Sequence, residues 1–252
     1  MPQPAVSSHP GRDGARLAYR EIGAGRPLIL LHGLLSDGRM WLLRGHAERF
    51  AAAGFRVIMP DFRAHGESDK PHDATAYPPD VLADDVLALL EHLDLADDDL
   101  AGYSLGARIA VRVLVRGATP GRAVIGGQGM RELLGAVGPA GAQLRRTLAG
   151  AGTFAPGSPD ARAEERLRSR GADPVALLHV VNSLLATPPD AIGRIQVRTL
   201  VVVGVDDERA ASTDQLVAAL PHGTLVLIPG DHAAAMTSPE LATAILDFLT
   251  QR

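Results

Sequence analysis

The sequence Gly102-Tyr103-Ser104-Leu105-Gly106 is the most informative stretch of the chain, because it sets a serine between two glycines at the boundary of a strand-like and a helix-like segment. A sharp turn from strand to helix exposes the serine side chain and holds its backbone in a strained conformation. Side chains two positions before and after the serine would collide in so tight a turn, which explains both glycines. The following helix also directs its unpaired N–H groups and positive dipole end toward the serine. The pentapeptide therefore makes Ser104 a candidate nucleophile.

Short apolar runs alternate with stretches of helical periodicity on both sides of this turn. Nearly continuous runs of Val, Ile and Leu are typical of strands that are covered on both faces, and their alternation with helices indicates a parallel sheet with right-handed crossovers. The sequence therefore predicts an α/β fold whose mostly parallel central sheet carries helices on both faces. The expected strands are residues 16–21, 28–32, 57–61, 98–103 and 123–127, and the expected helices are residues 41–53, 80–94 and 105–116.

The composition is that of a folded globular protein, with 46% hydrophobic and 21% charged residues among 252. A net charge of −4 offers no basic surface that would attract nucleic acid or anionic lipid. The absence of cysteine excludes disulfides, thiolate metal sites and a cysteine nucleophile. Residues 1–16 lack a signal-like apolar stretch, and no apolar run approaches the length of a membrane span. We therefore expect a cytoplasmic protein without nucleic-acid or membrane partners, whose oligomeric state the sequence does not indicate.

The strand pattern stops at about Gln128, and Gly, Ala and Pro dominate the segment that follows. Part of this segment, around Leu177, Leu178 and Val181, is too apolar for a fully solvated loop. The expected division is a core of residues 1–127 and 196–252 and a small helical insertion of residues 128–195, with helices around 161–170 and 174–185.

Five segments together resemble the α/β-hydrolase family, in the chain order of that family. The resemblance covers roughly residues 15–127 and 192–252, and it implies that the insertion is a cap over the active site, inserted after the sixth strand. Apolar residues of the cap, such as Leu177, Leu178 and Val181, are then expected to set the chain length that the site accepts. The matching segments are residues 28–33, 57–68, 102–106, 200–207 and 225–232.

The resemblance implies a triad of serine, histidine and acid. Ser104 is then the nucleophile, and His232, in a loop after the last strand, is the general base and later the acid. The family usually has the acid three positions after the glycine that ends its strand. Counting from Gly204 gives Asp207, whereas the adjacent Asp206 would cap the turn or face solvent.

The resemblance also assigns the oxyanion hole to the backbone N–H groups of Leu34 and Leu105. The chain departs from the family pattern at Tyr103, where histidine is frequent, and at Ala64, where glycine is frequent. Neither departure removes a catalytic group, but both change the local packing.

The remaining polar residues have simpler interpretations. Asp231 either bonds the backbone of its loop or is solvated, and residues 97–99 are three aspartates expected to be solvated, without the spacing of a calcium loop. Among the other histidines, those expected to form hydrogen bonds in turns or loops are His32, His65 and His222, and those expected to face solvent are His46, His72 and His92.

The activity that the resemblance implies is hydrolysis of a small or medium carboxylic ester through an acyl-enzyme, with no cofactor or metal and with a small-molecule ester-like substrate as the partner. A haloalkane dehalogenase is disfavoured, because its nucleophile is a carboxylate. The fold does not determine the substrate, so a lactonase, thioesterase, amidase, C–C bond hydrolase or perhydrolase remains an alternative. A ligand-binding, receptor-like protein with a vestigial triad is the alternative outside enzyme chemistry.

Overall fold

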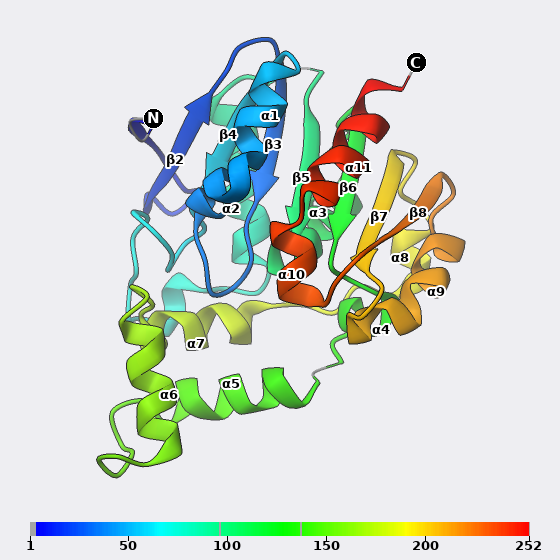
Figure 1. Ribbon diagram of the computed structural model, residues 1–252. Coiled ribbons are helices and arrows are strands. Elements are labelled where there is room, and N and C mark those ends of the chain that lie inside the picture. The colour runs from blue at the N-terminus through cyan, green and yellow to red at the C-terminus, as the bar shows by residue number, and fades with distance from the viewer. Residues whose placement is uncertain (1–3, 96, 137, 252) are drawn as a thin grey trace.

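The computed structural model describes residues 4–95, 97–136 and 138–251. Its centre is one eight-stranded sheet in the order β1-β2-β4-β3-β5-β6-β7-β8 (Figure 1). The first two strands run antiparallel to their neighbours, and the strands from β3 to β8 run parallel to one another, so the predicted α/β fold is confirmed. The strands are β1 (Val6–Pro10), β2 (Arg16–Ile22), β3 (Arg26–Leu31), β4 (Phe55–Pro60), β5 (Asp99–Tyr103), β6 (Arg122–Gly126), β7 (Arg198–Gly204) and β8 (Gly223–Ile228).

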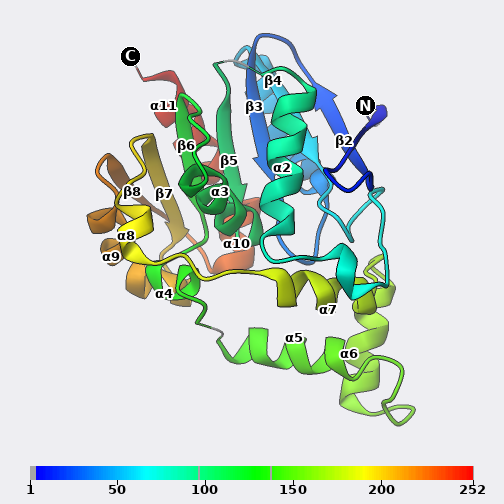
Figure 2. The same cartoon turned by 180° about the vertical axis from the view of Figure 1, so that it is seen from behind.

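Each face of the sheet is covered by helices, because alternate residues of the strands are apolar on both sides. In β3, Leu28 and Leu30 pack with residues of α1 (His46–Ala52) and α11 (Pro239–Thr250). The intervening Ile29 and Leu31 pack with α2 (Val81–His92) and α3 (Leu105–Val115) on the other face. Figures 1 and 2 show these two helix pairs on opposite faces. The loops after β3, β5 and β6 therefore start from strands whose middle residues are buried on both faces.

A helical insertion follows β6, as predicted, and the chain returns to the sheet at β7. It lies at the end of the sheet toward which the parallel strands run, with α7 nearest the sheet and α5 and α6 farther out (Figures 1 and 2). One of its helices, α5, was not predicted, because Gly and Ala dilute its apolar periodicity to Leu144 and Leu148. The insertion contains α4 (Met130–Leu133), α5 (Pro139–Ala149), α6 (Pro159–Arg168), α7 (Pro174–Ser183) and α8 (Pro189–Ile192).

The prediction of one helix over residues 41–53 was wrong. The chain forms a 3₁₀ segment, η1 (Gly38–Gly45), before α1 begins at His46. Arg44 (φ 60°) and Gly45 (φ 73°) adopt left-handed backbone conformations, which interrupt the helical hydrogen bonds. The N-terminal segment forms the short strand β1, and α11 begins after Ser238, whose side chain accepts from the Leu241 N–H as an N-cap.

Two polar residues predicted at the surface are buried. His46 is 1% exposed, and its Nε2 donates to the carbonyl oxygen of Met236 at 2.9 Å. Asp99 is 0% exposed, because its neighbour in the sheet is the start of β3, where the Arg26 guanidinium donates to its carboxylate at 3.0 Å. Burial raises the pKa of Asp99 to about 6, against the opposing effect of Arg26. The sequence pattern did not reveal either partner, since both come from elsewhere in the chain.

Exposure of the other histidines largely agrees with prediction. His72 and His92 are exposed, and the rings of His32 and His65 are buried in hydrogen bonds of their loops. The exposed His222 accepts a hydrogen bond through its backbone carbonyl from Thr199. Within the described ranges, no helix is both long and apolar enough to span a bilayer.

Candidate active site

Ser104 occupies the sharp turn between β5 and α3. Its backbone has φ 57° and ψ −116°, an unfavourable conformation for a residue with a Cβ atom. The Ser104 N–H donates to the carbonyl oxygen of Gly126 at 2.8 Å, and the side-chain amide of Gln128 donates to the Ser104 carbonyl oxygen at 2.8 Å. These two bonds hold the strained turn from the side of β6. Gln128 is 6% exposed and was not identified from the sequence.

The two glycines of the pentapeptide are required by close backbone contacts. A Cβ atom at Gly106 would overlap the carbonyl oxygen of Leu31, and one at Gly102 would overlap the backbone of Gly106. The turn can therefore form only with glycine at both positions, as the sequence predicted. Ala64, where the family often has glycine, adopts a positive φ of 71°, the left-handed conformation that glycine would occupy without strain.

Asp207 and His232 form a close pair on the neighbouring loops. The Asp207 Oδ2 atom lies 2.6 Å from Nδ1 of His232, and the Asp207 side chain is 1% exposed. Its Oδ1 atom accepts from the backbone N–H (3.1 Å) and the side chain (2.9 Å) of Arg209. Although burial acts to raise it, these hydrogen bonds from His232 and Arg209 hold the pKa of Asp207 below its usual value. The adjacent Asp206 is exposed, so only Asp207 contacts the histidine.

His232 begins the short helix α10 (His232–Thr237) and does not lie in a loop before α11, as was expected. The helix starts there because the Asp231 carboxylate accepts from the N–H groups of Ala233 (3.0 Å) and Ala234 (2.9 Å), an N-cap. The ring of Tyr103 packs 5.2 Å from the His232 ring, and its hydroxyl donates to the His232 carbonyl oxygen at 2.8 Å. Tyr103, the residue directly before Ser104, is therefore in direct contact with His232.

The loop after β3 carries Leu34 and is fixed by two buried histidines. His32 Nδ1 donates to the carbonyl oxygen of Gly33 at 2.8 Å, and its Nε2 accepts from the Phe62 N–H at 3.0 Å. This arrangement requires the neutral ring, and burial accordingly lowers the pKa of His32 to about 3. His65 Nε2 lies 2.7 Å from the carbonyl oxygen of Leu34. Both histidines thus fix the backbone that carries the Leu34 N–H.

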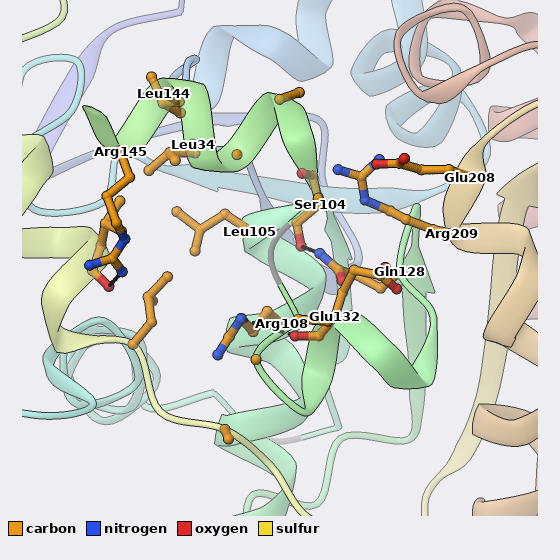
Figure 3. A pocket seen from close by; sticks show the side chains of 18 residues that line it. Leu34, Ser104, Leu105, Arg108, Gln128, Glu132, Leu144, Arg145, Glu208 and Arg209 are labelled. Atoms are coloured by element: carbon orange, nitrogen blue, oxygen red, sulfur yellow. Dashed lines mark hydrogen bonds between the residues drawn. The ribbon is translucent and has the colours of Figure 1, made fainter. Parts of the chain in front are cut away.

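A cavity of about 390 Å³ opens above Ser104, between the core and the insertion. Leu34 and Leu105, the two residues predicted to supply oxyanion-hole N–H groups, line it together with Ser104 (Figure 3). Arg209, which holds Asp207, also lines this cavity, so the Asp207–His232 pair adjoins it. The remaining lining residues include Arg108, Gln128, Glu132, Leu144, Arg145, Val181, Leu184 and Glu208.

The insertion contributes to this cavity differently from what the sequence suggested. Val181 of α7 lines it, but Leu177 and Leu178 do not. Leu177 is 1% exposed and packs in the hydrophobic cluster that contains Leu31 and Leu105. The expectation that Leu177 and Leu178 set the chain length is corrected accordingly: their face of α7 packs against the core, and the next turn of the helix reaches the cavity.

The described part of the chain contains no group of three His, Asp or Glu side chains arranged to hold a metal ion. The chemical groups that the site does offer are a strained serine on the cavity wall, an imidazole oriented by a buried carboxylate, and backbone N–H groups at a helix start. This combination is suited to nucleophilic attack on a carbonyl carbon.

A family described as alpha/beta hydrolase fold matches residues 26–125. The AB hydrolase superfamily protein YisY of Bacillus subtilis is 39% identical over 100 residues, which are 40% of this chain and 36% of that protein. The non-heme chloroperoxidase CPO-A1 of Kitasatospora aureofaciens is 36% identical over 108 residues, 43% of this chain and 38% of that protein. The matched stretches thus span little more than a third of the length of these curated relatives.

The likeness to solved structures extends over the whole chain. The crystal structure of a hydrolase from Pseudomonas aeruginosa PA01 has a TM-score of 0.79 at 25% identity, with 98% of both chains covered. That coverage includes the sheet, the flanking helices and the insertion after β6. The chain therefore has the α/β-hydrolase fold.

Proposed function

We propose that the protein is a serine hydrolase that cleaves a small or medium carboxylic ester. The observation that carries the proposal is the 2.6 Å hydrogen bond between Asp207 and His232, next to a cavity whose wall holds the strained Ser104. A buried carboxylate on Nδ1 directs the second ring nitrogen of His232 outward as a proton acceptor. A serine hydroxyl is a useful nucleophile only beside such a base.

In the proposed mechanism Ser104 Oγ attacks the ester carbonyl carbon while His232 accepts the hydroxyl proton. The backbone N–H groups of Leu34 and Leu105 stabilise the negative oxygen of the tetrahedral intermediate, a role that the start of α3 and the fixed loop after β3 support. His232 then donates its proton to the departing alcohol, which leaves an acyl group on Ser104. Water attacks this acyl-enzyme with His232 again as the base, and the acid and free Ser104 are released.

The insertion of residues 128–195 acts in this proposal as a cap that limits the size of the substrate. Val181 and Leu184 of the insertion line the cavity opposite the core residues Leu34 and Leu105. A cavity of about 390 Å³ accommodates a small or medium ester.

A panel of 4-nitrophenyl esters from acetate to octanoate tests the proposal. We expect Ser104-dependent turnover of the shorter esters, and we expect Ser104→Ala to lower kcat by several orders of magnitude, because the covalent route is lost. Circular dichroism and thermal unfolding of the variant control for the fold. Tight binding of esters without turnover by the wild type would instead indicate a receptor-like protein and would reject the enzyme proposal.

Perhydrolysis is a second candidate, because one relative of 36% identity is named a chloroperoxidase. The same acyl-enzyme attacked by hydrogen peroxide in place of water yields a peracid and free Ser104, with His232 accepting the peroxide proton. Peracid formation from ethyl acetate and hydrogen peroxide, measured against acetate release in water, separates the two activities. Turnover of lactones, of thioesters and of substrates with a cleavable C–C bond, measured in the same way, tests the other activities that the same fold supports.

A further inference from the structure

The charged side chains around the cavity are not distributed evenly. Three arginines and two glutamates line it, although the chain as a whole has a net charge of −4. Arg209 is bound by Asp207 at 2.9 Å, and the carboxylate of Glu132 lies 3.4 Å from Arg131. Arg108 and Arg145, by contrast, have no carboxylate within ion-pair distance among the residues that the structure describes.

Arg108 is one helical turn after Ser104. Residues four apart on a helix lie on the same face, and Ser104 and Arg108 both line the cavity. The two terminal nitrogens of Arg108 donate to the carbonyl oxygens of Glu132 (3.1 Å) and Leu185 (2.9 Å). A guanidinium has five N–H donors, and the Arg108 Nε is buried without an acceptor in the described structure.

The charge of Arg108 is poorly compensated where it stands. Burial lowers the pKa of Arg108, and the neighbouring guanidinium of Arg112 lowers it further, against an opposing effect of Asp80. Arg112 itself is neutralised by Asp80 at 2.8 Å. A partly buried cation that is held by neutral carbonyls alone gains most from an anionic ligand.

Arg145 approaches the same cavity from α5 in the insertion. One terminal nitrogen donates to the side-chain oxygen of Asn182 at 2.9 Å, which is also an uncharged partner. In the view of Figure 3, Arg145 lies to the left of Ser104, Arg108 lies below it beside Glu132, and Glu208 with Arg209 lies to the right. The cavity wall away from Arg209 therefore carries two guanidinium groups without an ion-pair partner among the described residues and one carboxylate, that of Glu132, which Arg131 approaches at 3.4 Å.

We propose that the substrate is an ester with a carboxylate on its acyl part, bound by Arg108 with assistance from Arg145. This inference rests on the proposed function only in making Ser104 the attacking group. One helical turn separates the Cβ atoms of such residues by about 5–6 Å. This spacing suits a half-ester of a short dicarboxylic acid, whose carbonyl carbon reaches Ser104 while its carboxylate reaches Arg108. Arg108 is then a specificity residue that discriminates anionic from neutral esters of equal length.

The test compares monomethyl glutarate with methyl pentanoate, which have acyl chains of equal length and differ in the carboxylate. We expect wild-type kcat/KM to favour the half-ester, and we expect Arg108→Gln to lower that preference about tenfold to a hundredfold, the effect of losing a charge-assisted hydrogen bond. Arg108→Lys should retain part of the preference, since it keeps the charge. Arg146→Gln, which removes one charge from α5 away from the cavity, is the matched control and should leave the ratio unchanged.

A calorimetric titration with glutarate measures the same subsite without hydrolysis. We expect glutarate to bind the wild type and to bind Arg108→Gln at least about tenfold more weakly. Equal losses for both esters in Arg108→Gln, no wild-type preference for the half-ester, or a glutarate Kd that is undetectable or unchanged by Arg108→Gln would each overturn the inference. Failure to hydrolyse any ester would reject the proposed function instead, and the glutarate titration would still decide the anion subsite.

Discussion

The sheet core and the helical insertion are built in different ways. In the core, the middle residues of β3, β5 and β7 are buried on both faces, and the loops that carry Leu34, Ser104 and Asp207 start from these strands. His232 follows the edge strand β8, which is only partly buried. In the insertion, α5 and α6 bury only two side chains each: Thr147 and Leu148, and Glu164 and Leu167. The candidate catalytic residues thus stand at the ends of strands of the core, whereas part of the cavity wall comes from a lightly packed segment.

From this difference we expect substitutions in the two regions to change different properties of the protein. Changes at the strand ends should affect the rate of reaction, because they move groups that must be held closely in position. Changes in the insertion should affect which substrate reacts, because a surface segment tolerates replacement without loss of the core. The three predictions that follow test this separation, from the largest expected effect to the smallest.

The largest effect is expected at the two adjacent aspartates after β7. Asp207→Asn should lower kcat by about 10⁴, because an amide favours the wrong tautomer of His232, as in the known case of a serine protease. Asp206→Asn should lower it by about tenfold or less, since Asp206 is exposed and does not touch the histidine. Steady-state kinetics of both variants on one ester decides this. Equal, mild losses would mean that another carboxylate orients His232.

Leu177 and Val181 lie one turn apart on α7, and their substitutions should have different effects. A change at Leu177 should mainly affect stability, and a change at Val181 should mainly affect substrate preference. Leu177→Ala should lower the free energy of unfolding by about 2–5 kcal/mol, because Leu177 is fully buried against the core. Val181→Ala should cost less stability, and should change discrimination between esters that differ by one methylene by about 1–3 kcal/mol. Urea unfolding and a chain-length series measure the two effects. A shift in chain-length preference for Leu177→Ala alone would reverse the assignment.

The loss of folding stability at low pH should arise from buried histidines of the core. The histidines whose pKa burial lowers are His9, His32, His46 and His65, all outside the insertion. His9 of β1 is 3% exposed, and its pKa is lowered from 6.5 to about 4. Between these values the unfolded chain binds a proton that the folded protein does not, so stability falls as pH falls through this window. Over the whole window, the pKa shift of His9 should contribute at most about 3 kcal/mol to this loss.

Urea unfolding of His9→Phe at pH 7 and pH 4.5 checks this value, because phenylalanine keeps the ring contacts with Tyr19 and His92 but cannot be protonated. The variant should lose less stability on acidification than the wild type. His222→Gln, which replaces an exposed histidine, is the control. An identical acid-induced loss in His9→Phe and wild type would show that His9 is not responsible.

The sequence predicted those features that backbone geometry dictates. The two glycines of the turn were predicted from steric requirements, whereas the resemblance to the α/β-hydrolase family, counted from Gly204, predicted which aspartate would meet His232. These signals are local, since each concerns a few consecutive residues at the end of a strand. The catalytic roles of Ser104, Asp207 and His232 stay predictions until they are measured.

Features that depend on distant partners could not be predicted in the same way. His46 appeared to be a surface residue, because its partner Met236 is 190 positions away. The helix α5 was missed since its apolar periodicity is weak, and the periodicity of α7 did not reveal which residues face the cavity. The sequence did not indicate a role for Arg108 and Arg145, because only the fold brings these two residues to the same cavity.

The central claim is that Ser104 is a nucleophile activated by His232 and Asp207. A fluorophosphonate, which reacts covalently with activated serines, tests this most directly when intact mass and peptide mapping follow the reaction. The account predicts one equivalent of label on Ser104, no label in Ser104→Ala, and strongly slowed labelling in His232→Gln. Label on another residue, or undiminished labelling in Ser104→Ala, would contradict it.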